Sequence, residues 1–77
     1  METAETLFGR EIAHARVARG LSQEELGHRA GIHVSYVSQL ERGLKSPSLR
    51  VILKIAEALD LPAHEFVKAV EASMRRS

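Results

Sequence analysis

Apolar residues recur at helical spacing along almost the whole of this chain. Phe8, Ile12 and Ala15 follow one another at intervals of four and three residues, so they share one face of a helix predicted over residues 6–19. Gly20 ends this segment, since glycine tolerates the positive φ found just past a helix C-terminus. No segment alternates apolar and polar residues, and neither Asn-Gly nor Asp-Gly marks a hairpin. The pattern predicts an all-α protein.

A second helix has a clear start signal. Ser22 and Glu25 have the spacing of a capping box, in which each side chain accepts a hydrogen bond from the backbone N–H of the other residue. Leu21 and Leu26 flank this cap as a hydrophobic staple. Gly31 then ends the helix after about residue 30. We therefore expect a short helix from the cap at Ser22 to the turn at Gly31.

A third short helix follows almost at once, from near His33 to Gly43. Only Gly31 and two further residues separate it from the preceding helix, so the two helices must cross steeply. Gly27 lies where a side chain would block their close approach. If Val37 is at the centre of the buried face, the helical period turns a row of polar side chains outward. These are Ser35, Ser38, Gln39 and Arg42.

Two more helices complete the predicted architecture. Ser46 or Ser48 caps the fourth, and Pro47 is compatible with either cap. Apolar residues at spacings of three and four then follow: Leu49, Ile52, Ile55, Ala56 and Leu59. Asp60 and Pro62 interrupt the chain before a fifth helix over residues 63–75. The expectation is five helices in one domain over residues 1–77, with frayed ends at about 1–5 and 75–77.

Composition excludes several classes of protein. The chain of 77 residues has no cysteine, so it can hold neither a disulfide nor a thiolate metal site, and its four histidines lack the i, i+4 spacing of a helical metal site. It lacks the basic start and apolar run of a secretory signal, and any apolar run of the ~20 residues that span a membrane. A soluble cytoplasmic protein is expected. The net charge of +1 decides little, because a domain that coats nucleic acid is usually far more basic.

No catalytic constellation is visible. Asp60 is the only aspartate, and no glycine-rich loop suited to phosphate is present. The sequence therefore predicts a protein that is not an enzyme, with no cofactor, no metal and no evident small-molecule ligand.

Residues 7–70 resemble the phage repressor and Cro type of helix-turn-helix, the XRE-like family. The matching residues are Gln23, Leu26, Gly27, Ala30, Gly31, Ile32, Val37, Leu40, Glu41, Arg42 and Gly43. The segment SPSLRVILKIAEALDLP is similar to the fourth helix of that family. The resemblance implies a five-helix lambda-repressor-like fold with its helix-turn-helix at about residues 22–43. In length and layout the chain is also similar to the controller proteins of restriction–modification systems.

The resemblance further implies that the third helix enters the major groove of double-stranded DNA. The implied base-reading residues are His33, Val34, Ser35, Ser38 and Gln39. The implied phosphate contacts are Gln23, Tyr36, Arg42, Lys45 and Ser46. Arg16 and Glu41 match a pair that joins the first and third helices by a structural salt bridge. Taken alone, the polar row would suit a solvated face, whereas within the whole pattern it favours a DNA-facing surface. A further hypothesis is that protonation of His33 near phosphates strengthens binding below neutral pH.

Apolar residues of the last two helices exceed what five short helices easily bury. One interpretation is a well-covered core with a few stray apolar residues. The other, which the resemblance favours, is a self-complementary dimer patch formed by Val51, Leu53, Phe66, Val67 and Val70. A homodimer would read a near-palindromic operator with half-sites about 34 Å apart. We therefore expect a sequence-specific transcriptional regulator, such as a repressor. The alternative is an antitoxin-like or other protein–protein interaction module with the same fold.

Overall fold

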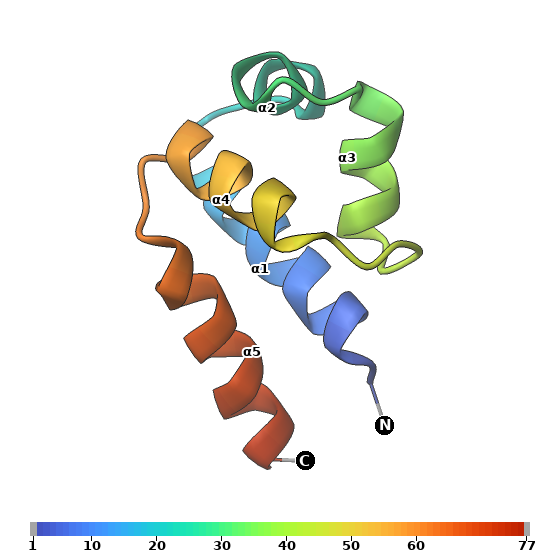
Figure 1. Ribbon diagram of the computed structural model, residues 1–77, viewed down its shortest axis with the longest axis vertical. Coiled ribbons are helices and arrows are strands. Elements are labelled where there is room, and N and C mark those ends of the chain that lie inside the picture. The colour runs from blue at the N-terminus through green and yellow to red at the C-terminus, as the bar shows by residue number, and fades with distance from the viewer. Residues whose placement is uncertain (1, 77) are drawn as a thin grey trace.

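The computed structural model describes residues 2–76, and this part of the chain forms five α-helices and no strand (Figure 1). The helices are α1 (Ala4–Ala18), α2 (Gln23–Ala30), α3 (Val34–Glu41), α4 (Leu49–Ala58) and α5 (Ala63–Arg76). The prediction of an all-α, five-helix fold is thus confirmed. Within the described range, no helix is long and apolar enough to cross a membrane.

The helix ends show where the sequence pattern was less exact. α1 begins at Ala4 rather than at Thr6, because the Thr3 side chain accepts a hydrogen bond from the Thr6 backbone N–H at 3.1 Å and caps the helix. α5 continues to Arg76. The ends expected to fray, 1–5 and 75–77, therefore overlap ordered helix, while Met1 and Ser77 lie outside the described residues. Of the two candidate caps for α4, the structure uses Ser48, whose hydroxyl accepts from the Val51 N–H at 3.2 Å.

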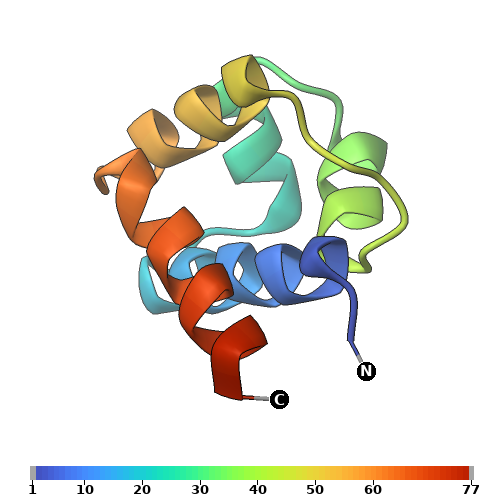
Figure 2. The same ribbon diagram turned by 60° about the horizontal axis from the view of Figure 1, so that its bottom comes forward.

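Each of the five helices packs mainly against two others. α1 lies against both α3 and α5, α2 packs on α3 and α4, and α4 packs on α5 (Figures 1 and 2). The chain ends lie at the same end of the molecule (Figure 1). α3 makes its main contacts with α1 and α2 and lies at one edge of the molecule (Figure 1).

One apolar cluster joins all five helices. Its fully buried members include Ile12, Leu26, Leu40, Ile55 and Leu59. Phe66 also belongs to it, at 4% exposure, with its ring edge-to-face against Phe8 at a centroid distance of 6.2 Å. The assignment of Phe66 to a dimer interface was therefore wrong, because this side chain is already covered within its own chain.

α1 and α3 approach so closely that only glycine fits between them at one position. A Cβ atom on Gly9 would lie 2.7 Å from the carbonyl oxygen of Glu41 and closer still to that of Leu40. These are backbone atoms, which cannot move aside as the end of a flexible side chain can. The bare backbone of Gly9 thus allows the C-terminal end of α3 to rest directly on α1.

Replacing Gly9 with alanine should destabilise the protein by about 1–3 kcal/mol, because the overpacking cost outweighs the gain in helix propensity. Urea or thermal unfolding followed by circular dichroism measures this change. His14→Ala is the matched control: His14 is exposed in the same helix, so this variant should be as stable as the parent or slightly more so. Equal stability of both variants would contradict the close approach of α1 and α3.

Candidate functional site

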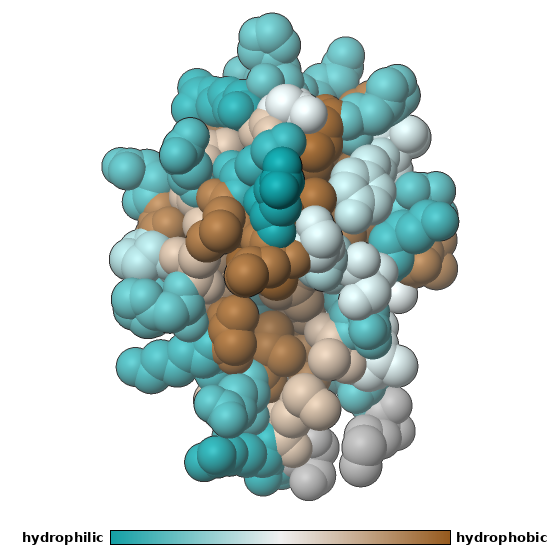
Figure 3. Space-filling model, in the orientation of Figure 1, coloured by the Kyte–Doolittle hydropathy of each residue, from teal (hydrophilic) through white to brown (hydrophobic). Residues whose placement is uncertain are grey.

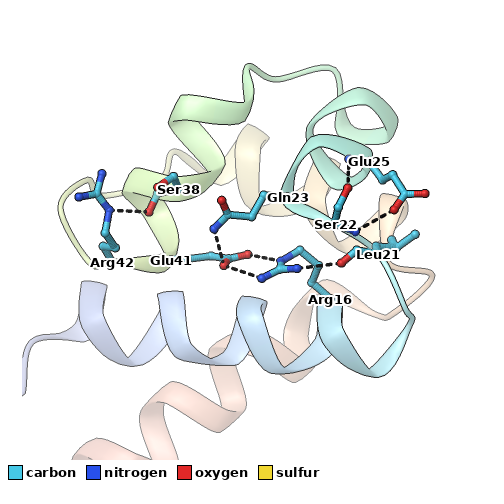
Figure 4. Close-up of polar contacts among 8 residues, drawn as sticks. All are labelled: Arg16, Leu21, Ser22, Gln23, Glu25, Ser38, Glu41 and Arg42. Carbon is cyan, nitrogen blue, oxygen red and sulfur yellow. Dashed lines mark hydrogen bonds and ion pairs between the residues drawn. The ribbon is translucent and has the colours of Figure 1, made fainter.

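α2 and α3 form a compact pair joined by a tight turn. The predicted capping box is present at the start of α2: the Glu25 N–H donates to the Ser22 hydroxyl at 3.0 Å, and the Ser22 N–H donates to the Glu25 carboxylate at 2.9 Å (Figure 4). Hydrogen bonding of the Glu25 carboxylate to Ser22, mainly to its backbone N–H, lowers the pKa of Glu25 below its ordinary value. Gly31 ends the helix in the left-handed conformation, with φ 71°. The Ile32 N–H then donates to the carbonyl oxygen of Gly27 at 2.9 Å and closes the turn.

Gly27 gives this turn room to close. A Cβ atom there would lie 2.7 Å from the carbonyl oxygen of Ile32 and 3.5 Å from both the backbone nitrogen of Val34 and a methyl group of Val37. The expectation that a side chain at this position would obstruct the approach of the next helix agrees with these distances. The turn and the first residues of α3 are therefore held against the backbone of α2.

α3 buries one side and leaves the other uncovered. Val37 and Leu40 are each 1% exposed in the core, whereas His33 and Ser35 are exposed and Ser38 and Gln39 are half-buried. The helical period places Ser35, Ser38 and Gln39 opposite the buried side, on the edge of the molecule that no other helix covers (Figure 1). Val34 is half-buried at the edge of this surface.

The first turn of α3 is capped by a histidine. The His33 ring nitrogen Nδ1 accepts a hydrogen bond from the backbone N–H of Ser35 at 3.0 Å. The Ser35 hydroxyl oxygen lies 2.8 Å from the same nitrogen. Two of the residues predicted to read bases are therefore bonded to each other.

The orientation of α3 is secured by a polar network beneath its C-terminal end (Figure 4). Arg16 donates to both carboxylate oxygens of Glu41, from Nε at 2.7 Å and from a terminal nitrogen at 3.1 Å, and its other terminal nitrogen donates to the Leu21 carbonyl at 2.8 Å. The Arg16 side chain is 15% exposed and the Glu41 side chain is 7% exposed. Hydrogen bonding to Glu41 raises the pKa of Arg16 above its ordinary value, against the opposing effect of its partial burial. The salt bridge that the family resemblance implied is thus present.

Gln23 also binds this carboxylate. Its side-chain nitrogen donates to Glu41 Oε1 at 3.0 Å, so the residue links the start of α2 to the end of α3. Sequence reasoning placed Gln23 at a DNA phosphate and missed this partner. One amide hydrogen is engaged within the protein, which leaves the second available for a phosphate.

The remaining phosphate candidates surround the C-terminal end of α3. Arg42, Lys45 and Ser46 are exposed, and Arg42 Nε donates to the Ser38 backbone carbonyl at 3.4 Å (Figure 4). Tyr36 is half-buried and packs against the core, so only part of its side chain faces solvent. Ser46 lines a pocket together with Phe8 of α1 and with Val67 and Val70 of α5, so the structure does not gather all of these residues on the outer surface of α3.

The residues assigned to a dimer patch fall into three groups. Leu53 and Val67 are about half exposed, at 52% and 53%, whereas Val51 and Val70 are partly buried against the core. Phe66 lies inside the core, as described above. Leu49 is 72% exposed, although its spacing had placed it on the buried face. Apolar side chains gather on one side of the molecule over α4 and the first half of α5 (Figure 3).

No candidate metal centre is found in the described part of the chain, where no three acidic or histidine side chains come close enough to hold an ion.

The chain matches known proteins over most of its length. The family model described as "Helix-turn-helix" matches residues 12–66. The HTH-type transcriptional regulator y4dJ of Sinorhizobium fredii is 38% identical over 61 residues, which cover 79% of each chain. A second regulator from that organism, y4dL, is 43% identical, but the match covers 66% of this chain and only 26% of y4dL. The crystal structure of the restriction–modification controller protein C.AhdI from Aeromonas hydrophila aligns with a TM-score of 0.78 at 44% identity, over 79% of this chain and 92% of that one.

Removing the shared carboxylate should loosen α3. We expect Glu41→Ala to lower the free energy of unfolding by about 1.5–3 kcal/mol, because the Arg16 guanidinium and the Gln23 amide lose their acceptor in a largely buried site. Gln23→Ala leaves the ion pair intact and should cost only about 0.5–1.5 kcal/mol. Chemical denaturation of both variants and of the double variant measures the coupling. An equal cost for the two single changes would contradict the central role of Glu41.

Proposed function

The chain belongs to the helix-turn-helix family of DNA-binding transcriptional regulators, and on this premise we propose that it binds a specific double-stranded DNA site as a homodimer through α3. The observation that carries the proposal is the uncovered polar side of α3, held outward by packing on α1 and α2 and by the Glu41 network. An α-helix is narrow enough to enter the major groove of DNA. With α3 in the groove, the tight turn would hold α2 across the DNA backbone.

Base recognition is assigned to the outer face of α3. Gln39 has the amide needed for a bidentate contact with adenine, and Ser35 and Ser38 can bond to base edges through their hydroxyls. His33 lies at the leading end of the helix. Val34 is half-buried, so a thymine methyl group would contact only the part of this side chain that remains accessible.

Phosphate binding is assigned to the groups on either side of that face. Arg42 and Lys45 bring positive charge to the C-terminal end of α3, with the Ser46 hydroxyl beside them in sequence. Gln23 offers its second amide hydrogen at the start of α2, where backbone N–H groups also favour an anion. Because the net charge is only +1, this local concentration of donors must supply much of the attraction to DNA.

Dimerisation is assigned to the apolar surface of α4 and α5. Leu53 and Val67 are its exposed members among the residues predicted from sequence, and Leu49 extends the apolar surface along α4. To read a near-palindromic operator, such a two-fold dimer must hold its two α3 helices about 34 Å apart, one turn of DNA. Likeness to C.AhdI makes the control of restriction–modification genes the first regulatory role to test. A cytoplasmic location follows from this role and stays a prediction.

A second candidate function rests on the same apolar surface. If Leu49, Leu53 and Val67 contact a different protein, the chain would act as an antitoxin-like or other interaction module. DNA affinity separates the two functions, because it should fall steeply with salt as phosphate contacts release counterions. A DNA affinity that does not vary with salt would favour the interaction module.

The assignment of α3 predicts two distinct defects. After selection of bound sequences from a random DNA library, Gln39→Ala should weaken binding to the selected site by about 1–3 kcal/mol and relax the preference at one position. Arg42→Ala should instead weaken binding to all sequences alike and reduce the salt slope by about one. Fluorescence anisotropy titrations measure both effects, with Lys68→Ala on the exposed surface of α5 as the charge-matched control. An unchanged sequence preference in Gln39→Ala would contradict base reading by this residue.

The dimer assignment predicts a change of mass. Leu53→Glu should shift the protein towards monomer and lower its affinity for a two-half-site operator, because it puts a charge into an apolar contact. Analytical ultracentrifugation at tens of micromolar measures the assembly state. Val17→Glu makes the same change at a residue that is 65% exposed outside the patch, and should leave the dimer intact. A parent protein that is monomeric at this concentration would contradict the proposal.

A further inference from the structure

The cap of α3 determines which nitrogen of His33 carries the proton. A backbone N–H can only donate, and the Ser35 N–H points at His33 Nδ1 at 3.0 Å. Nδ1 must therefore be an acceptor, and in the neutral ring the proton resides on Nε2. His33 is exposed, so Nε2–H is directed away from the cap as a hydrogen-bond donor.

The same cap determines the polarity of the Ser35 hydroxyl. Its oxygen lies 2.8 Å from Nδ1, which is hydrogen-bond distance. Because Nδ1 carries a lone pair and no proton, the hydrogen must come from the serine. The Ser35 hydroxyl therefore donates inward to the ring and presents only lone pairs outward.

From these two contacts we propose that His33 and Ser35 form a specificity-determining pair of fixed polarity. Ser35 accepts from a base amino group in the major groove, which means adenine N6 or cytosine N4. His33 Nε2 donates to an acceptor, either a guanine or adenine edge or a phosphate oxygen. The inference rests on the proposed entry of α3 into the major groove and adds to it the chemical class of group that each residue binds.

Removal of single functional groups from the selected DNA site tests the polarity. The base pair that Ser35 contacts is identified as the one whose preference is lost in Ser35→Ala. At pH 8, replacing its adenine or cytosine with an analogue that lacks the amino group should weaken binding of the parent about 2–10-fold and have no effect on Ser35→Ala. Replacing a purine at that pair with its 7-deaza analogue, which lacks the N7 acceptor, should leave the difference in affinity between the parent and Ser35→Ala in place.

Removal of the His33 ring tests its link to Ser35. In His33→Ala the Ser35 hydroxyl loses its acceptor and is free to turn, so the loss caused by removing the amino group should be smaller than in the parent. His28→Ala is the matched control, since this exposed histidine lies on α2 and its replacement should leave that loss unchanged.

Each failure has its own signature. If the library yields no enriched sequence, the proposed function falls, and this inference falls with it. Suppose instead that a sequence is enriched, but removal of the amino group leaves the affinity unchanged, or removal of the N7 acceptor lowers the affinity as much as Ser35→Ala does. In either case α3 still reads DNA, and only the fixed polarity is overturned. A loss of the same size in His33→Ala as in the parent would show that His33 does not set the polarity of Ser35.

Discussion

The carboxylate of Glu41 fixes the position of α3. It lies at the last residue of α3, and it accepts hydrogen bonds from Arg16 on α1 and Gln23 on α2. Arg16 extends the same network to the Leu21 carbonyl in the connection between those helices. A short helix has little stability of its own, so its direction in space must come from such tertiary contacts. α3 presents its polar face in one orientation because this network and the apolar contacts of Val37 and Leu40 act from the same side.

An ion pair in this place favours orientation over raw stability. Burying two charges costs much of what their attraction returns, and an apolar pair of similar volume often packs as well. Apolar groups, however, pack against one another at many angles. The Arg16–Glu41 pair is bidentate and Gln23 adds a third hydrogen bond, and each of these bonds has a fixed direction. Gly9 complements this network, since the missing side chain allows α3 to lie directly on α1. Close backbone contact and directed hydrogen bonds together leave α3 little freedom to tilt.

Local signals could be predicted from sequence, and contacts across space could not. Ser22 and Glu25 are three residues apart, so the pair that caps α2 is visible in a short segment. Nothing within α1 indicates that Gly9 faces two carbonyl groups of α3, because that contact depends on how the helices cross. Phe66 and Leu49 were misplaced for a related reason: helical spacing defines a face, but only the packed structure determines how much of that face is covered. The bond from Gln23 to Glu41 was missed because the two residues lie on different helices.

His33 shows how a locally unfavourable choice can be consistent with function. Asparagine, aspartate and serine are the residues that usually start a helix, and histidine caps less well. At the start of α3, however, the ring reaches further than these shorter side chains. Nδ1 accepts a hydrogen bond from the Ser35 N–H, while Nε2, on the far side of the ring, is a second polar group at the exposed surface. The polar surface of α3 therefore begins at His33, the residue that ends the turn. The stability of the first turn of α3 and the hydrogen-bonding polarity of that surface depend on the same nitrogen atom.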